Sequence, residues 1–288
     1  MTQRIALCGS GGLLGSEFRS ALSKDLRGFM QLPRACIEDA DVEVITAILR
    51  EAKISIVINC IAHTNLEAAE VDPSLDKFVN STIPGALAKA CSSLNILLVH
   101  FSSTGCYGHW KDDPYIESDQ LVPPTQHHLA KYRGEMLVRS SGCRHLIIRT
   151  GWLFGGSIDQ PKNFVWKRIL EASQSTDIIS DNSQRGCPTY VGDVVAQSLA
   201  MLSEEISGTF NVVAHGSASR YEYVAAIISF AGLSCKVKPG PGFKRQAPVS
   251  MNEMAVNFEL QQQGMDLMTH WRTPLRRYIL GLPLSLVQ

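Results

Sequence analysis

Three glycines near the N-terminus have the spacing of a phosphate-binding turn. Gly9, Gly12 and Gly15 follow the apolar run Ile5–Cys8 and lead into the helical pattern Ser16–Leu22. Gly9 permits a sharp turn out of a strand, Gly12 lets the backbone approach a pyrophosphate, and Gly15 lets the helix pack close to the sheet. A plain strand-to-helix turn is the alternative. The position directly after the first strand favours a dinucleotide site at the helix N-terminus.

The end of the second expected strand bears on the choice of dinucleotide. Residues 28–32 read as that strand, and Pro33 and Arg34 close it. An acidic residue here would accept the ribose hydroxyls of NAD, whereas an arginine suits the extra 2′-phosphate of NADP. Because the strand end carries Arg34 and no acid, we expect NADPH in preference to NADH. A solvated loop arginine is the alternative interpretation.

Further strands and helices alternate along the chain and must position the remaining polar residues. Apolar and β-branched runs predict buried strands, and apolar residues at helical spacing predict helices. The expected strands are 54–60, 96–101, 145–155 and 208–213, and the expected helices are 42–51, 78–91, 163–170, 194–201 and 271–279. Asp41 is a plausible N-cap of the first of these helices, and Ser219 with Glu222 begins another.

Composition excludes several classes of function. The 288 residues include 27 acidic and 27 basic side chains, so no electrostatic footprint for nucleic acid is present. No apolar run approaches the ~18 to 20 residues needed to span a bilayer. The first strand begins by Ile5, which leaves no room for a signal peptide. We therefore expect a cytoplasmic protein with no nucleic-acid or membrane partner.

The cysteines do not predict a metal site or a disulfide framework. The chain has eight cysteines, and none of them forms a Cys-x-x-Cys pair. Several lie inside apolar runs, which is typical of reduced, buried thiols. We expect all eight to be structural and no metal to be bound.

Several short motifs occur in order along the chain. Residues 59–70 read Asn-Cys-Ile-Ala-His-Thr-Asn-Leu-Glu-Ala-Ala-Glu, and 102–108 read Ser-Ser-Thr-Gly-Cys-Tyr-Gly. Residues 149–152 read Arg-Thr-Gly-Trp, and 184–189 read Gln-Arg-Gly-Cys-Pro-Thr. This series resembles the dTDP-4-dehydrorhamnose reductases, a family in the extended branch of the short-chain dehydrogenase/reductase superfamily. Two positions depart from the family pattern, namely Ser183 in place of aspartate and Gln246 in place of proline.

The resemblance implies a fold and an activity. The fold is α/β, a Rossmann-type doubly wound parallel sheet with a small C-terminal substrate-binding lobe. Residues 1–155 and 191–215 would form the dinucleotide-binding domain, and 156–190 and 216–288 the sugar-nucleotide lobe. The activity would be NAD(P)H-dependent reduction of a nucleotide-activated 4-keto-6-deoxy sugar.

The resemblance also assigns site residues. Ser103 takes the position of the catalytic hydroxyl that hydrogen-bonds the substrate carbonyl, and Lys131 that of the lysine that holds the nicotinamide ribose. The cofactor set is Gly9, Gly12, Leu13, Leu14, Arg34, Cys60, Ala62, Thr64 and Lys131. The substrate set is Thr64, Ser103, Thr104, Trp152, Asn163 and Arg245. From spacing alone, a turn serine, a core tryptophan and a loop arginine are the alternatives for Ser103, Trp152 and Arg245.

One departure concerns the catalytic acid. The family carries Tyr-x-x-x-Lys on a helix, whose two functional side chains share a face. Here the lysine is Lys131, so His127 occupies the tyrosine position. An imidazolium can donate a proton, since imidazole ordinarily titrates near ~6.5, but the charge of Lys131 favours the neutral ring.

Three interpretations follow from that departure. His127 replaces tyrosine as the acid; or the proton comes from His128, from Tyr132, or from water relayed through Ser103; or the chemistry is slow or lost. In the last case the chain is a cofactor- or sugar-nucleotide-binding accessory subunit of a partner enzyme. We expect reductase chemistry, and an epimerase-type relative is a further alternative. The expected partners are a nucleotide-sugar substrate and either a second copy of the chain in a homo-oligomer or a partner enzyme.

Overall fold

A parallel six-stranded sheet forms the centre of the computed structural model, which describes residues 4–24, 28–242 and 245–287. Its strands are β1 (Ile5–Cys8), β2 (Phe29–Leu32), β3 (Ile56–Asn59), β4 (Leu97–Ser103), β5 (His145–Thr150) and β10 (Gly208–Asn211). The order is β2-β1-β3-β4-β5-β10, and every neighbouring pair is parallel. From β1 the chain adds β2 on one side and then, from β3 onward, adds the remaining strands on the other side. Open α/β sheets bind ligands at the carboxyl ends of the strands at such a reversal point.

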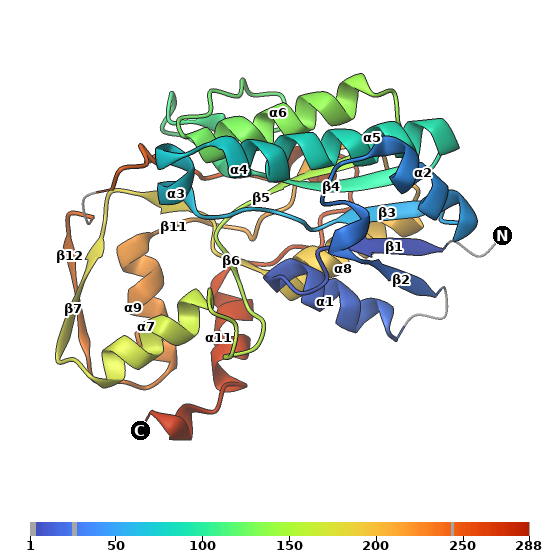
Figure 1. The fold of residues 1–288 in the computed structure, drawn as a ribbon. Coiled ribbons are helices and arrows are strands. Elements are labelled where there is room, and N and C mark those ends of the chain that lie inside the picture. The colour runs from blue at the N-terminus through green and yellow to red at the C-terminus, as the bar shows by residue number, and fades with distance from the viewer. Residues whose placement is uncertain (1–3, 25–27, 243–244, 288) are drawn as a thin grey trace.

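Helices cover both faces of this sheet (Figure 1). The helices are α1 (Leu13–Leu22) and α8 (Val191–Ser203) on one face, and α2 (Val42–Glu51), α5 (Ile83–Leu94) and α6 (Gln126–Ser140) on the other. Ile5 and Leu7 pack toward α1 and α8, whereas Ala6 and Cys8 pack toward α2 and α5. Because both faces are buried, the central strands are mostly apolar, and polar residues such as Asn59 and Arg149 lie toward their carboxyl ends. The predicted doubly wound parallel sheet is confirmed.

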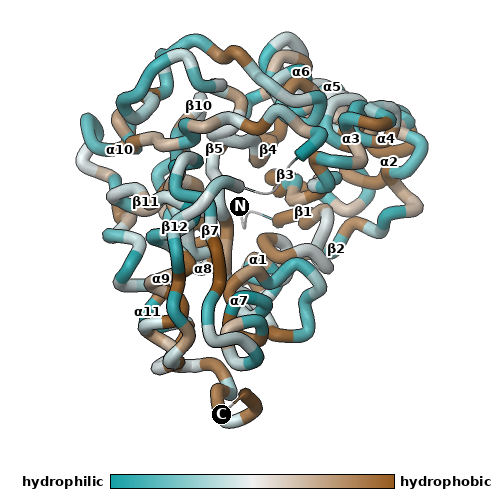
Figure 2. Tube along the Cα trace, turned by 90° about the vertical axis from the view of Figure 1, so that its left-hand side faces the viewer, coloured by the Kyte–Doolittle hydropathy of each residue, from teal (hydrophilic) through white to brown (hydrophobic). Residues whose placement is uncertain are grey.

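A smaller lobe packs beside the carboxyl edge of the sheet. It contains α7 (Phe164–Ser173), α9 (Arg220–Phe230), α11 (Arg272–Leu280) and the parallel pair β7 (Asp177–Asp181) and β12 (Lys236–Gly240). Figure 2 shows the hydrophobic residues of β7 beside the more hydrophilic β12. Trp166, Ile227 and Trp271 are central to its apolar core. At the start of α9, Ser219 and Glu222 form the expected reciprocal cap.

Short elements complete the architecture. They are the paired strands β6 (Leu153–Phe154) and β9 (Thr189–Tyr190), the paired strands β8 (Arg185–Gly186) and β11 (Ala218–Ser219), the helices α3 (Leu66–Val71), α4 (Ser74–Lys77) and α10 (Phe258–Gln262), the 3₁₀ turns Arg34–Cys36, Thr104–Tyr107 and Leu284–Leu286, and the π turn Phe78–Thr82. Across the described residues, no helix combines the length and the apolar character needed to cross a bilayer.

The structure differs from the expected elements at three places. α1 begins at Leu13, directly after Gly12, rather than at Ser16. The expected helix 78–91 starts earlier, at α4, and continues through the π turn into α5. The expected strand 145–155 is interrupted after Thr150, because Trp152 adopts a left-handed conformation with φ +48°.

The stretch of chain before α11 does not remain in the smaller lobe. Leu260 of α10 and Met268 belong to the apolar core of the large sheet, and the Tyr115 N–H donates to the carbonyl oxygen of Met254 (2.8 Å). The chain then returns to the lobe with Trp271 and α11. Part of the stretch 216–288 therefore packs on the dinucleotide-binding side.

Candidate active site

A cavity of about 570 Å³ lies at the carboxyl ends of the central strands. It brings together the glycine turn, the loop after β3, the end of β4, one face of α6 and a loop of the smaller lobe. The lining residues are Gly11, Gly12, Leu13, Leu14, Cys60, Ile61, Ala62, Thr64, Phe101, Ser102, Ser103, His127, Lys131, Thr150, Gly151, Leu153, Gln160, Pro161 and Lys162. Its size and its few polar groups are typical of a site for a small ligand or cofactor.

The glycine turn has the close contacts that the sequence predicts. A Cβ on Gly15 would lie 2.1 Å from the carbonyl oxygen of Gly9, so glycine is required where α1 meets the turn. Gly9 has φ +75°, and a Cβ there would lie 2.9 Å from the backbone of Cys60. Gly11 and Gly12 line the cavity, and a Cβ on Gly11 would meet nothing within 4 Å. This cradle fits a pyrophosphate, as a dinucleotide cofactor requires.

Ser103 ends β4 and lines the cavity. Its Oγ accepts a hydrogen bond from the Gly105 N–H (3.1 Å), so the hydroxyl proton is not used in this contact. The turn role and the ligand role are therefore compatible. The next residue, Thr104, is buried and does not line the cavity, because its hydroxyl packs against Gly151.

Lys131 and Lys162 bring two ammonium groups to the cavity. Lys131 is buried on α6, and its Nζ donates to the carbonyl oxygen of Phe101 (2.6 Å). Burial lowers the pKa of Lys131. Lys162 reaches across from the smaller lobe, and its Nζ donates to Thr64 Oγ1 (2.5 Å). Lys162 was not predicted, because its loop approaches Thr64 only in the folded chain.

His127 lies in the first turn of α6, four residues before Lys131, as predicted. Thr125 caps this helix by accepting from the His128 N–H (3.0 Å). Nδ1 of His127 lies 3.1 Å from Oδ1 of Asp76, a fully buried side chain on α4. The same oxygen accepts from Nδ1 of His63 (2.8 Å).

The charge of Asp76 is maintained by its hydrogen bonds. Burial alone would raise the pKa of Asp76, but the hydrogen bond and charge of His127, with the hydrogen bond of His63, outweigh it and lower that pKa. The carboxylate is therefore ionised at neutral pH. Neither Asp76 nor His63 was predicted as a site residue, since 51 positions separate Asp76 from His127 and no local motif links them.

The other expected proton donors on α6 do not reach the cavity. His128 is buried against Thr125 Oγ1 (3.0 Å), and burial lowers its pKa to about 3. A neutral, enclosed imidazole is a poor acid at neutral pH. Tyr132 is not among the residues that line the cavity. His127 and Ser103 remain as the candidates that face a ligand there.

Six residues of the predicted ligand sets are not among those that line the cavity: Gly9 and Thr104, described above, and Arg34, Asn163, Trp152 and Arg245. Arg34 is exposed in a 3₁₀ turn after β2. Asn163 caps α7 by accepting from the Trp166 N–H (3.0 Å), and its amide donates to protein oxygens, so it serves the lobe rather than a ligand. Trp152 and Arg245 also lie elsewhere.

Trp152 and Arg245 belong to a polar cluster in the smaller lobe. The guanidinium of Arg220 lies 3.4 Å from the centre of the Trp152 ring, and Trp152 Nε1 donates to Glu253 Oε2 (3.1 Å). Arg245 forms an ion pair with Glu67 of α3 (3.7 Å). The tryptophan ring is therefore covered by an arginine, and it also packs against Gly186, where an added Cβ would lie 2.4 Å from a ring carbon.

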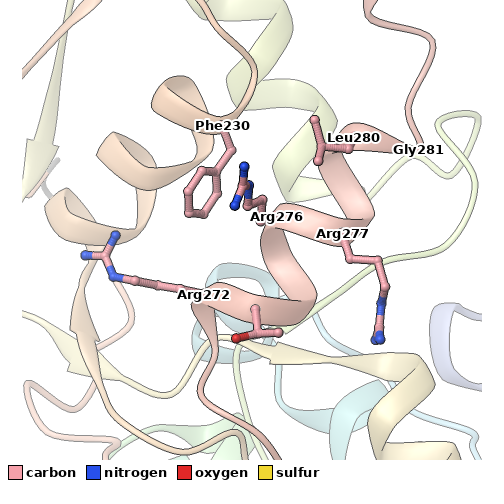
Figure 3. A pocket seen from close by; sticks show the side chains of 7 residues that line it. Phe230, Arg272, Arg276, Arg277, Leu280 and Gly281 are labelled. Atoms are coloured by element: carbon pink, nitrogen blue, oxygen red, sulfur yellow. The ribbon is translucent and has the colours of Figure 1, made fainter.

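A second hollow, of about 740 Å³, lies on the outside of α11 (Figure 3). Phe230 and three arginines line it, and one of them, Arg277, pairs with Asp193 (3.2 Å). Its lining contains no strand-end residue and none of the groups described above. The smaller cavity is therefore the candidate active site.

A glycine turn beside β1, with a serine, a histidine and a lysine at the carboxyl edge, defines a Rossmann-type nucleotide-cofactor oxidoreductase. The chain belongs to the family described as RmlD substrate binding domain, whose family model matches residues 3–282. It is 27% identical over 282 residues to the dTDP-4-dehydrorhamnose reductase of Mycobacterium tuberculosis (strain H37Rv), covering 95% of this chain and 91% of that protein.

Two solved structures have the same fold. A dTDP-4-dehydrorhamnose reductase from Clostridium acetobutylicum has a TM-score of 0.91 at 26% identity, covering 96% of this chain and 98% of that one. The enzyme of the same name from Bacillus anthracis, solved in complex with NADP, has a TM-score of 0.92 at 24% identity, covering 98% of this chain and 100% of that one. The resemblance to the reductase family, predicted from the sequence motifs, is confirmed.

Proposed function

We propose that this protein is an NADPH-dependent reductase of a nucleotide-activated 4-keto-6-deoxy sugar. The observation that carries the proposal is the placement of Ser103, His127 and Lys131 in one cavity with the glycine turn. The relatives described above are named as reductases, and these names do not support the alternative of an accessory subunit.

The glycine turn and the two lysines would hold the cofactor. Gly11 and Gly12 offer a backbone surface to the pyrophosphate, and the N-terminus of α1 favours its negative charge. Lys131, which lines the cavity, would hydrogen-bond the nicotinamide ribose. Lys162 adds positive charge at the cavity wall beside Thr64. The Bacillus anthracis relative was solved in complex with NADP, which supports NADPH as the cofactor.

The reaction joins a hydride and a proton to a ketone. When bound, the reduced nicotinamide supplies the hydride to the carbonyl carbon. Ser103 donates its hydroxyl proton as a hydrogen bond to the carbonyl oxygen and stabilises the negative charge that develops there. His127, as the imidazolium, gives its Nε2 proton to that oxygen, so the ketone becomes a secondary alcohol and the ring becomes neutral.

Single-turnover oxidation of NADPH on a panel of 4-keto-6-deoxy sugars with dTDP, GDP and UDP carriers tests this function. We expect oxidation with at least one member of the panel. The Ser103→Ala variant should lose about 10²- to 10³-fold in rate, because one donor to the oxyanion is removed, while its affinity for NADPH stays unchanged. Tight NADPH binding by the wild type with no oxidation on any sugar would contradict the proposal.

A further inference from the structure

A buried carboxylate joins two histidines at the wall of the cavity. Oδ1 of Asp76 accepts hydrogen bonds from Nδ1 of His127 (3.1 Å) and Nδ1 of His63 (2.8 Å). The Asp76 side chain is fully buried, whereas 8% of the His127 side chain and 22% of the His63 side chain are exposed. The three residues come from α4, α6 and the loop after β3, so only the folded chain assembles them.

We propose that Asp76 is the positioning residue for His127. It fixes Nδ1 of the ring, leaves Nε2 as the nitrogen available to the cavity, and stabilises the imidazolium that protonates the substrate oxygen. This inference rests on the proposed function, because that function gives His127 the role of the acid. The proton passes from Nε2 to the carbonyl oxygen, and Asp76 keeps its charge throughout.

Asp76 places a buried negative charge in hydrogen-bond contact with both imidazoles. Asp76 is ionised, and its second oxygen, Oδ2, has no hydrogen-bond partner among the described residues. Lys131 interacts electrostatically with this carboxylate without forming an ion pair with it, so with both imidazoles neutral the buried negative charge would be only partly compensated, which is costly. One proton on either ring removes that charge.

Three other ionisable groups lie close to His127 in the sequence or the fold, namely Lys131, His128 and Glu70. On its own helix, Lys131 lies one turn on and opposes an imidazolium, while the His128 ring, 5.2 Å away, is neutral. From α3, Glu70 contributes a negative charge and accepts from the Gln126 N–H (2.6 Å). Asp76 is the group that hydrogen-bonds the His127 ring, and Coulomb energy falls with distance.

His63 competes with His127 for the same charge. It is nearer to Asp76 and more exposed, but it does not line the cavity. A proton on His63 reduces the advantage that Asp76 gives to a proton on His127. Removal of the Asp76 charge and removal of the His63 ring should therefore shift the pH at which His127 loses its proton in opposite directions.

The test uses two variants of the full chain. Asp76→Asn keeps the side-chain shape and an acceptor oxygen but removes the charge, and His63→Gln removes the competing ring. The first measurement is the pH dependence of single-turnover NADPH oxidation. The second is an NMR titration of the His127 imidazole without substrate.

We expect Asp76→Asn to move both midpoints down by about 1 pH unit or more, since an adjacent opposite charge shifts a titration by roughly that amount. At a pH above the wild-type midpoint the rate should fall about tenfold and recover in acid, with the affinity for NADPH unchanged. His63→Gln should move both midpoints up. In a His127→Tyr background, Asp76→Asn should leave the pH profile where it is, because tyrosine does not need the carboxylate.

Unchanged NMR midpoints in Asp76→Asn would overturn the inference, whatever the enzyme does with sugars. Equal losses of rate in both variants, without a shift in either midpoint, would also overturn it and would indicate a structural role. If the wild type fails to oxidise NADPH with every sugar on the panel, the proposed function fails. A shifted imidazole titration in Asp76→Asn would still support the pairing of Asp76 with His127.

Discussion

Lys162 adds a cation from the smaller lobe to a cavity otherwise built by the large sheet. Its Nζ contacts Thr64, and both residues line the cavity with the glycine turn. We predict that Lys162→Met weakens NADPH binding about tenfold at low salt, because a hydrogen bond to a charged group contributes roughly 1.5 to 3 kcal/mol. Fluorescence titration with NADPH measures the effect. Lys167→Met, which removes an exposed lysine outside the cavity, is the matched control, and an equal loss in both variants would contradict the assignment.

Single residues differed in how far the sequence predicted them. Ser103 and Lys131 were found because each sits in a short local motif, and the cavity contains both. Asp76 and His63 were missed, because their meeting with His127 depends on how α4 packs under α6. The roles of the predicted site residues remain predictions. Residue spacing predicts which side chains share one face of a helix, whereas two histidines that share a carboxylate are brought together only by the tertiary fold.

At the scale of elements, the contact between α1 and the glycine turn is one of the tightest that a substitution can test. A Cβ on Gly15 would lie 2.1 Å from the Gly9 carbonyl oxygen. Alanine favours a helix by about 1 kcal/mol over glycine, but overpacking against rigid backbone costs roughly 1 to 3 kcal/mol and more when the clash is severe. We predict that Gly15→Ala lowers the free energy of unfolding by about 1 to 2 kcal/mol in urea denaturation. Gly11→Ala, whose Cβ meets no atom within 4 Å, should change it by under about 0.5 kcal/mol.

Elements with a strong local signal were predicted well. The β-branched runs gave the central strands, and Asp41 caps α2 as expected, accepting from the Glu43 and Val44 N–H groups. The break after β5 was missed: Trp152 has a left-handed backbone conformation there, and its side chain contacts Arg220 and Glu253, which are distant in sequence. Secondary-structure propensity depends on a local run of residues, so contacts with another lobe cannot be predicted from that run.

At the scale of the whole molecule, the sequence motifs predicted the parallel sheet, but they did not predict where the chain crosses between its two parts. Residues near Leu260 return to the large sheet before α11 rejoins the smaller lobe. Buried polar contacts fix this path: the Val213 N–H donates to Asn257 Oδ1 (2.9 Å), and Asn257 Nδ2 donates to the Val213 carbonyl oxygen (2.9 Å). Such pairings between distant segments have no periodic signature.

The stability of the whole fold should fall in acid because His128 is buried as the neutral ring. Its pKa is lowered from an ordinary value near 6.5 to about 3, so between these values the unfolded chain binds a proton that the folded chain does not. The contribution of the neutral His128 ring to the free energy of unfolding is complete above pH 6.5 and is lost as the pH falls toward 3. At pH 5 the loss from this ring is about 2 kcal/mol. Urea denaturation at pH 7.5 and pH 5 measures it. His128→Gln cannot take up the proton, so its stability should differ between the two pH values by about 2 kcal/mol less than that of the wild type, even if the substitution lowers stability at both. An equal pH dependence in the two proteins would show that the ring titrates normally in the folded chain.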